Sequence, residues 1–158
     1  MSSQAVAATP ELAAWVAFLR AHAALTRSLN GDLVNTHGLT LNDYEVLLHL
    51  SRAEGRQLRR IDLAQRLILT ASGITRLLEG LERAGYVRKG QCASDARVTY
   101  AVLTDAGLAK LKAASRTHTQ GIRDLFGSRF SDEELATLGD LLGRLPALGT
   151  DAGDCSAE

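Results

Sequence analysis

The sequence of 158 residues contains little cysteine, little proline and few aromatic residues. It has two cysteines and two prolines, and aromatic residues make up 4%. Two cysteines cannot form the disulfide framework of a small secreted domain, and no apolar run approaches the roughly 18 residues of a membrane span. Residues 1–9 lack the basic and apolar regions of a secretory signal, so we expect a cytoplasmic protein without membrane association. The scarcity of proline favours helices.

Motifs of catalysis and of metal binding are also missing. The sequence has no Gly-rich phosphate loop and no nucleophile elbow, and Ser72-Gly73 does not lie within one. Four scattered histidines have no cysteine or acid at metal-ligand spacing. We therefore expect neither an enzyme nor a protein with a metal or cofactor.

Charge is unevenly distributed, although the chain has 18 basic and 18 acidic residues. Residues 52–97 contain ten cations and five acids, a net charge of +5, and the rest of the chain is therefore −5. A basic middle between acidic ends is typical of a chain whose middle faces phosphates. The alternative is a solvated surface on which cations cluster by chance.

The chain ends predict long helices. Thr9-Pro10 is a helix start with a capping residue and a proline at the first position, followed by an apolar stripe that runs to Leu33. Thr104 is expected to cap a second long helix, and Ser131 with Glu134 a last one that Pro146 ends.

The middle of the chain predicts a compact helical domain with a hairpin. Thr40 with Asp43 resembles a capping box before a helix that stops at Gly55. Two more helices are expected at residues 61–67 and 70–84, then a hairpin of strands 86–88 and 98–103 around a tip at 89–96. The fold class is mainly α with a small β wing, a winged helix-turn-helix.

This arrangement would place polar and basic groups where a DNA duplex could meet them. The helix start at Thr70, Ala71 and Ser72 offers hydroxyls and backbone N–H groups to phosphates. One turn further on, Thr75 and Arg76 would face the major groove. The remaining predicted DNA contacts are cations. Lys89 and Arg97 lie in the hairpin. Arg59 and Arg60 precede the helix at 61–67, where positive charge opposes the helix dipole, so this helix start makes more sense if an anion approaches it.

The sequence resembles the multiple antibiotic resistance regulator (MarR) family of bacterial transcription factors. The resemblance covers residues 10–148 and lies in four motifs in order: Leu63-Ala64-Gln65-Arg66-Leu67, Ile74-Thr75-Arg76-Leu77-Leu78, Leu81-Glu82-Arg83-Ala84-Gly85-Tyr86-Val87, and Asp95-Ala96-Arg97 followed by Leu103-Thr104-Asp105-Ala106-Gly107. It departs from the family pattern at Ala96, where the family commonly has arginine.

The resemblance implies a homodimer on double-stranded DNA. Residues 9–38 and 104–148 would form dimerisation helices and residues 39–103 the winged DNA-binding domain, with a disordered segment 1–8 and a flexible tail 149–158. Asp95 would brace Arg97, which enters the minor groove. Most members repress nearby genes and many leave a pseudo-palindromic operator when a small phenolic or similar ligand binds.

Four residues are candidates for binding such a ligand: Trp15, His22, Asp43 and Tyr44. The urate-responsive branch of the family has a tryptophan and an Asp-aromatic pair at similar places, but its two arginines do not align with Arg76 and Arg88. The alternative is that Trp15 and His22 belong to the dimer junction and that Asp43 is a plain helix cap.

Two further alternatives stay open at this point. Cys92, near Arg88 and Lys89, could be a thiol switch with a pKa lowered by those cations, or an inert exposed cysteine. The whole chain could also be a winged-helix module for protein interaction or scaffolding that does not bind DNA.

Overall fold

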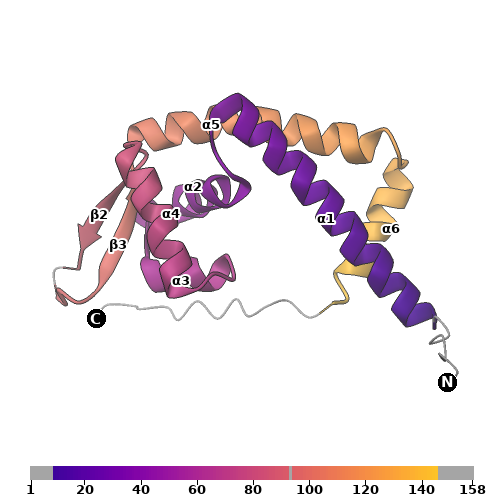
Figure 1. The fold of residues 1–158 in the computed structure, drawn as a ribbon, viewed down its shortest axis with the longest axis horizontal. Helices are drawn as coiled ribbons and strands as arrows, with labels where there is room; N and C mark the ends of the chain where they lie inside the picture. The colour runs from indigo at the N-terminus through magenta and orange to yellow at the C-terminus, as the bar shows by residue number, and fades with distance from the viewer. Residues whose placement is uncertain (1–8, 93, 146–158) are drawn as a thin grey trace, which may run out of the picture.

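Two long helices and a small winged domain make up the molecule. The computed structural model describes residues 9–92 and 94–145. Helix α5 runs along the top of Figure 1 and packs against α1, with the winged domain at one end of α5 and α6 near the other. The elements are α1 (Pro10–His37), α2 (Leu41–Arg52), η1 (Glu54–Arg56), β1 (Gln57–Arg59), α3 (Arg60–Arg66), α4 (Ala71–Arg83), β2 (Val87–Gln91), β3 (Thr99–Leu103), α5 (Asp105–Ile122), η2 (Arg123–Gly127) and α6 (Asp132–Leu142).

The predicted helix starts are confirmed. Thr9 caps α1 with Pro10 at the first position, and its hydroxyl accepts a hydrogen bond from the N–H of Leu12. Thr40 and Ser131 form full capping boxes with Asp43 and Glu134. Each of these signals is local, because the capping side chain and the N–H groups it accepts from are three residues apart.

Helices α2, α3 and α4 pack with a three-stranded sheet into the core of the winged domain. The sheet is antiparallel in the order β1-β3-β2, with Val87 opposite Leu103 and Leu58 opposite Ala101. Apolar side chains from these helices and strands, with contributions from α1 and α5, fill the core: Leu33, Leu39, Tyr44, Val46, Leu47, Leu50, Leu63, Ala64, Ile74, Leu78, Leu81, Val87, Ala101, Leu103, Leu111 and Ala114.

Several predicted bounds are wrong. Strand β1 was not expected, and it continues the sheet beyond the hairpin. Strand β2 runs to Gln91, so Lys89 and Gly90 lie within the strand and not at the tip. Gly90 pairs with Tyr100, and a side chain there would crowd Val102. The helix predicted to stop at Gly55 ends at Arg52. Pro146, expected to end the last helix, and the segments 1–8 and 149–158 lie outside the described residues.

The winged domain joins α5 through one residue. Thr104 lies between β3 and α5, where its hydroxyl donates to the Gly85 carbonyl at 2.7 Å and accepts from the Gly107 N–H at 3.0 Å. A Cβ on Gly107 would overlap the carbonyl oxygen of Tyr86. The Leu-Thr-x-x-Gly pattern is therefore the sequence of a tight junction between strand and helix.

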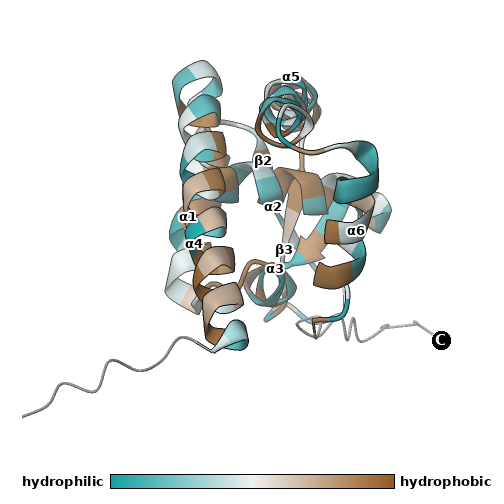
Figure 2. Ribbon diagram, turned by 90° about the vertical axis from the view of Figure 1, so that its right-hand side faces the viewer, coloured by the Kyte–Doolittle hydropathy of each residue, from teal (hydrophilic) through white to brown (hydrophobic). Residues whose placement is uncertain are grey.

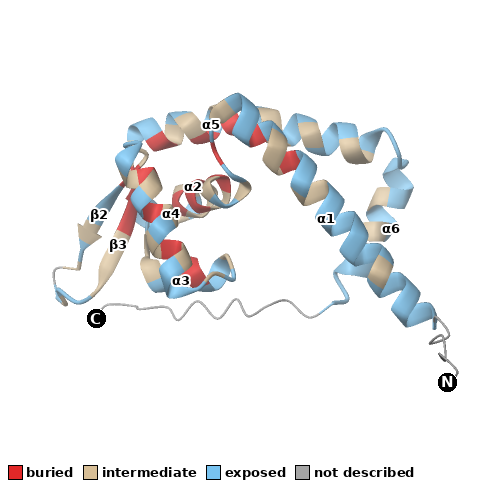
Figure 3. Ribbon diagram, viewed as in Figure 1, coloured by how far each residue is buried: buried red, intermediate tan, exposed pale blue. Residues whose placement is uncertain are grey.

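The apolar faces of α1 and α6 are largely uncovered. Of the predicted α1 stripe, only Leu29 and Leu33 are buried, and Trp15 is 56% exposed. Figure 3 shows that the N-terminal half of α1 and most of α6 are exposed, and Figure 2 shows that both carry apolar residues there. The exposed large apolar side chains are Leu12, Trp15, Phe18, Leu19 and Val34 of α1, and Leu141 and Leu142 of α6. None of the helices within residues 9–92 and 94–145 has the length and apolar character of a membrane span.

Candidate nucleic-acid interface

The start of α4 is exposed and carries hydroxyl groups. Thr70 caps the helix by accepting from the Gly73 N–H at 3.0 Å, and the Thr70 and Ser72 hydroxyls are in hydrogen-bond contact at 3.2 Å. The first turn has no acid. Backbone N–H groups at a helix start carry the positive end of the helix dipole, so this end attracts anions.

The sides of α4 separate core residues from charged ones. Ile74, Leu78 and Leu81 are buried, and Gly85 follows the helix at φ +77, the left-handed conformation that commonly ends a helix. Arg76 is exposed on the outer side. The Thr75 hydroxyl donates to the Ala71 carbonyl at 2.8 Å, so Thr75 is only half exposed and already has one partner.

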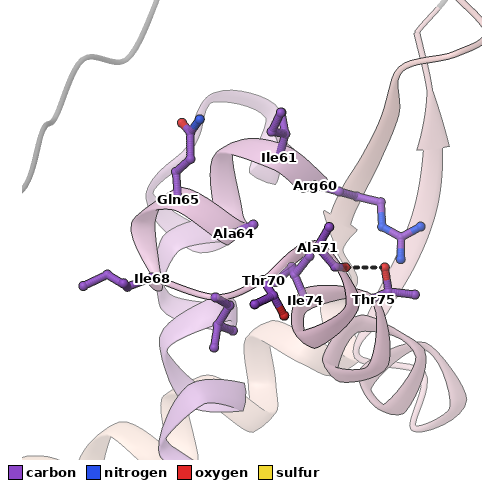
Figure 4. A pocket seen from close by; sticks show the side chains of 10 residues that line it. Arg60, Ile61, Ala64, Gln65, Ile68, Thr70, Ala71, Ile74 and Thr75 are labelled. Atoms are coloured by element: carbon purple, nitrogen blue, oxygen red, sulfur yellow. Dashed lines mark hydrogen bonds between the residues drawn. The ribbon is translucent and has the colours of Figure 1, made fainter.

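The first turn of α3 contains an acidic residue, Asp62, that pairs with the basic residue before the helix. Arg59 donates two hydrogen bonds to the Asp62 carboxylate, at 2.8 and 3.0 Å. The expectation that the basic start requires an external anion is therefore wrong for Arg59, because Asp62 in the same first turn supplies it. Arg60 lines a groove between α3 and α4, and in Figure 4 its guanidinium extends toward Thr75.

The segment between β2 and β3 presents Arg97 to the solvent. The Arg97 side chain is 92% exposed, and its Nε and backbone N–H both donate to Oδ1 of Asp95, at 3.2 and 2.9 Å. Asp95 thus braces Arg97, which is the geometry that the family resemblance implies. Lys89 lies on β2, and its ammonium is 3.7 Å from the Glu82 carboxylate on α4.

The four candidate ligand residues do not form one site within the chain. Trp15 and His22 lie on the exposed half of α1, where their rings flank that of Phe18. Asp43 is the capping-box acid of α2, as the alternative held, and Tyr44 is buried in the core. Trp15 is about 30 Å from the C-terminal end of α1 at 1.5 Å per residue, and α2 begins only after that end.

A partly buried polar cluster at the junction of the helices was not expected from the sequence. The Tyr44 hydroxyl is 3.3 Å from the Ser115 hydroxyl, and the Tyr44 ring packs on His118 with centroids 4.6 Å apart. Nδ1 of His118 is buried without a partner among the described residues, and burial lowers the pKa of this histidine. His37 is bonded to Thr117 at 2.7 Å. The signal was present in the sequence, because Ser115 and His118 follow the buried Leu111 and Ala114 at helical spacing.

The cause expected for a reactive Cys92 is wrong. The pKa of its thiol is lowered by hydrogen bonds, first from the Ser94 side chain at 3.1 Å and then from the backbone of Ser94 and Asp95. Arg88 and Lys89 are not among the causes. In residues 9–92 and 94–145, no group of histidine, cysteine, aspartate and glutamate side chains could hold a metal ion.

The fold and the exposed start of α4 define a winged helix-turn-helix protein. A model of the MarR family matches residues 37–98. The structure of AbsC, a MarR family transcriptional regulator from Streptomyces coelicolor, is 35% identical with a TM-score of 0.76, and the match covers 85% of this chain and 90% of that one. The chain belongs to the MarR family of transcriptional regulators.

Two further relatives bear on DNA binding. Sco3205, a MarR family regulator from Streptomyces coelicolor solved in complex with DNA, is 27% identical with a TM-score of 0.79, covering 90% of this chain and 89% of that one. The transcriptional repressor YetL of Bacillus subtilis is 34% identical over 68% of this chain. The chain spans about 66% of the length of YetL and 62% of the Escherichia coli regulator PrsX. These names are of regulators and not of enzymes, in agreement with the sequence prediction.

Proposed function

We propose that the protein is a homodimeric repressor that binds a pseudo-palindromic operator on double-stranded DNA in the cytoplasm. The observation that carries this proposal is Arg97 of the wing, whose side chain is 92% exposed and is bonded to Asp95. An arginine at a hairpin tip fits the narrow minor groove, where the negative potential is enhanced. The solved DNA complex of Sco3205 supports the same use of the fold.

The proposed contacts divide by their role. Arg60, Ser72 and Lys89 would meet phosphates, and Arg76 would meet base edges in the major groove. Thr70, Ala71 and Thr75 surround the start of α4 and would lie close to the duplex. Arg59 would act indirectly, because its bidentate bond to Asp62 shapes the start of α3.

Homodimerisation follows from the uncovered faces of the terminal helices. Large apolar side chains that stay exposed on α1 and α6 are costly in water, and a second copy of the chain can cover them. Two winged domains would then read the two half-sites of one operator, spaced by whole turns of the duplex.

A small ligand would release the repressor only if it binds one arrangement of the dimer more tightly than the other. The favoured arrangement must be the one in which the spacing of the two winged domains does not fit DNA. The cluster of Tyr44, Ser115 and His118 supports an effector that acts at the junction of α2 with α5, because this is where the winged domain meets the long helix. A thermal-shift screen with phenolic acids tests whether the protein binds such an effector. An effector must both raise the melting temperature and release DNA.

The test of DNA binding is a mobility shift with the promoter upstream of the protein's own gene. We expect binding that weakens steeply with salt, and about tenfold weaker binding by Arg97→Ala with unchanged circular dichroism. Arg27→Ala, an exposed arginine of α1, is the matched control and should bind like the wild type. If the wild type binds no promoter fragment, the protein-interaction alternative replaces this proposal.

A further inference from the structure

Two isoleucines stand out on the surface of the winged domain. Ile68 is 73% exposed and Ile61 is 62% exposed, the highest values among the large apolar side chains of the described residues. Both line a groove of about 760 Å³ between α3 and α4 (Figure 4). The opposite wall of the groove includes Ala71 and Ile74 of α4.

The backbone of Ile68 is in a conformation that disfavours isoleucine. Its φ is +54°, in the left-handed region, immediately after α3 and its C-cap residue Leu67. Glycine is the usual residue there, because a β-branched side chain at positive φ is strained. The exposed side chain gains no burial within the chain in return. Strain of this kind that persists is found where a side chain has a function.

The groove continues the proposed DNA-binding surface. Thr70 and Ala71, at the start of α4, line it, and of its ten described lining residues only Arg60 is charged. A partner with negative charge beside a small apolar group would match this combination. The major groove of DNA offers both, since phosphates border it and the thymine C5-methyl is the apolar group on its base edges.

We propose that Ile68, assisted by Ile61, is a specificity-determining residue that contacts thymine methyl groups next to the bases read by α4. This inference rests on the proposed function. The contact would favour A·T pairs at the flank of each half-site, without any hydrogen bond to the base.

The test removes the methyl group from the DNA and the side chain from the protein. Binding is measured on the footprinted operator and on the same duplex with deoxyuridine in place of thymidine. We expect the wild type to bind the deoxyuridine duplex about fourfold more weakly for each contacted methyl. Ile68→Gly and Ile68→Asn, which both tolerate positive φ, should bind the thymidine duplex more weakly and distinguish the two duplexes much less. Their melting temperatures should equal or exceed that of the wild type.

Arg97→Ala is the control. It should weaken binding to both duplexes equally and keep the full preference for thymidine. Equal wild-type affinity for the two duplexes overturns the inference while DNA binding stands, and so does an Ile68→Gly variant that keeps the wild-type preference. Failure of the wild type to bind the unmodified operator overturns the proposed function itself.

Discussion

At Gly107, helix α5 closely approaches the backbone of Tyr86 in the winged domain. We expect Gly107→Ala to lower the free energy of unfolding by about 1–3 kcal/mol, because the added Cβ would overlap the Tyr86 carbonyl and force the strand and helix apart. Urea denaturation measures the change.

Gly80, in the middle of α4, provides the matched control. Nothing lies within 4 Å of a Cβ built there. Gly80→Ala should stabilise the protein by about 0.5–1 kcal/mol through helix propensity alone. Equal effects of the two substitutions would show that the close approach at Gly107 is unimportant.

His118 gives stability a dependence on pH. Burial lowers its pKa below the ordinary value of 6.5, so the unfolded chain binds a proton at a higher pH than the folded chain does. Stability should therefore fall as the pH falls below about 6.5 and level off below the folded pKa. His118→Phe, which keeps a ring on Tyr44, should reduce this slope in urea titrations between pH 5.5 and 7.5.

Another histidine contributes with the same sign. Burial, then Arg66 and Arg52, lower the pKa of His49. The slope left in His118→Phe should decrease further in the double variant with His49→Gln. An unchanged slope in His118→Phe would contradict the assignment of the pH dependence to the cluster of Tyr44, Ser115 and His118.

At the scale of elements, the Thr104 hydroxyl couples α5 to the turn between α4 and β2, where Gly85 lies. Thr104→Ala removes both the helix cap and the bond to Gly85, and we expect a loss of about 1–2 kcal/mol in the free energy of unfolding. Thr104→Ser keeps the hydroxyl and should retain most of the stability. If Ser and Ala variants unfold at the same urea concentration, the two bonds do not stabilise the junction.

Elements with local signals could be predicted from the sequence, and those with distant partners could not. The starts of three helices could be predicted from their capping residues, Thr9, Thr40 and Ser131, because a cap and the N–H groups it binds are close together in the chain. Strand β1 is three residues long and exists through its pairing with β3, more than forty residues later, which no local pattern contains.

The candidate site was predictable to a similar degree. Asp95 and Arg97 are two residues apart, and their pairing could be expected from the motif. The pairing of Arg59 with Asp62 was not predicted, although the two residues are close in sequence. The sequence shows that Arg59 is a cation but does not show which way its side chain points. Ile68 falls between the helices expected at residues 61–67 and 70–84, and no sequence pattern marks it, since its positive φ and its exposure are properties of the folded chain.

At the scale of the whole molecule, the uncovered face of α1 predicts the oligomeric state. Leu19 is 44% exposed on this face. Leu19→Glu should convert the dimer to monomers in sedimentation velocity and abolish operator binding, because it places a charge in the apolar contact. Ala24→Glu adds the same charge about 140° away around the helix, at 100° per residue, and should leave the dimer intact. A wild-type monomer at micromolar concentration would contradict the proposed assembly.

The single residue between β3 and α5 has a mechanical consequence. With the Thr104 hydroxyl bonded on both sides and Gly107 against Tyr86, the hairpin and the helix have no flexible linker between them. Helix α5 has 18 residues and is therefore about 27 Å long, so a tilt of roughly 5° displaces its far end by about 2 Å. In the proposed dimer, the helix would act as a lever that transmits a small rotation at the contact between subunits to the hairpin at its other end.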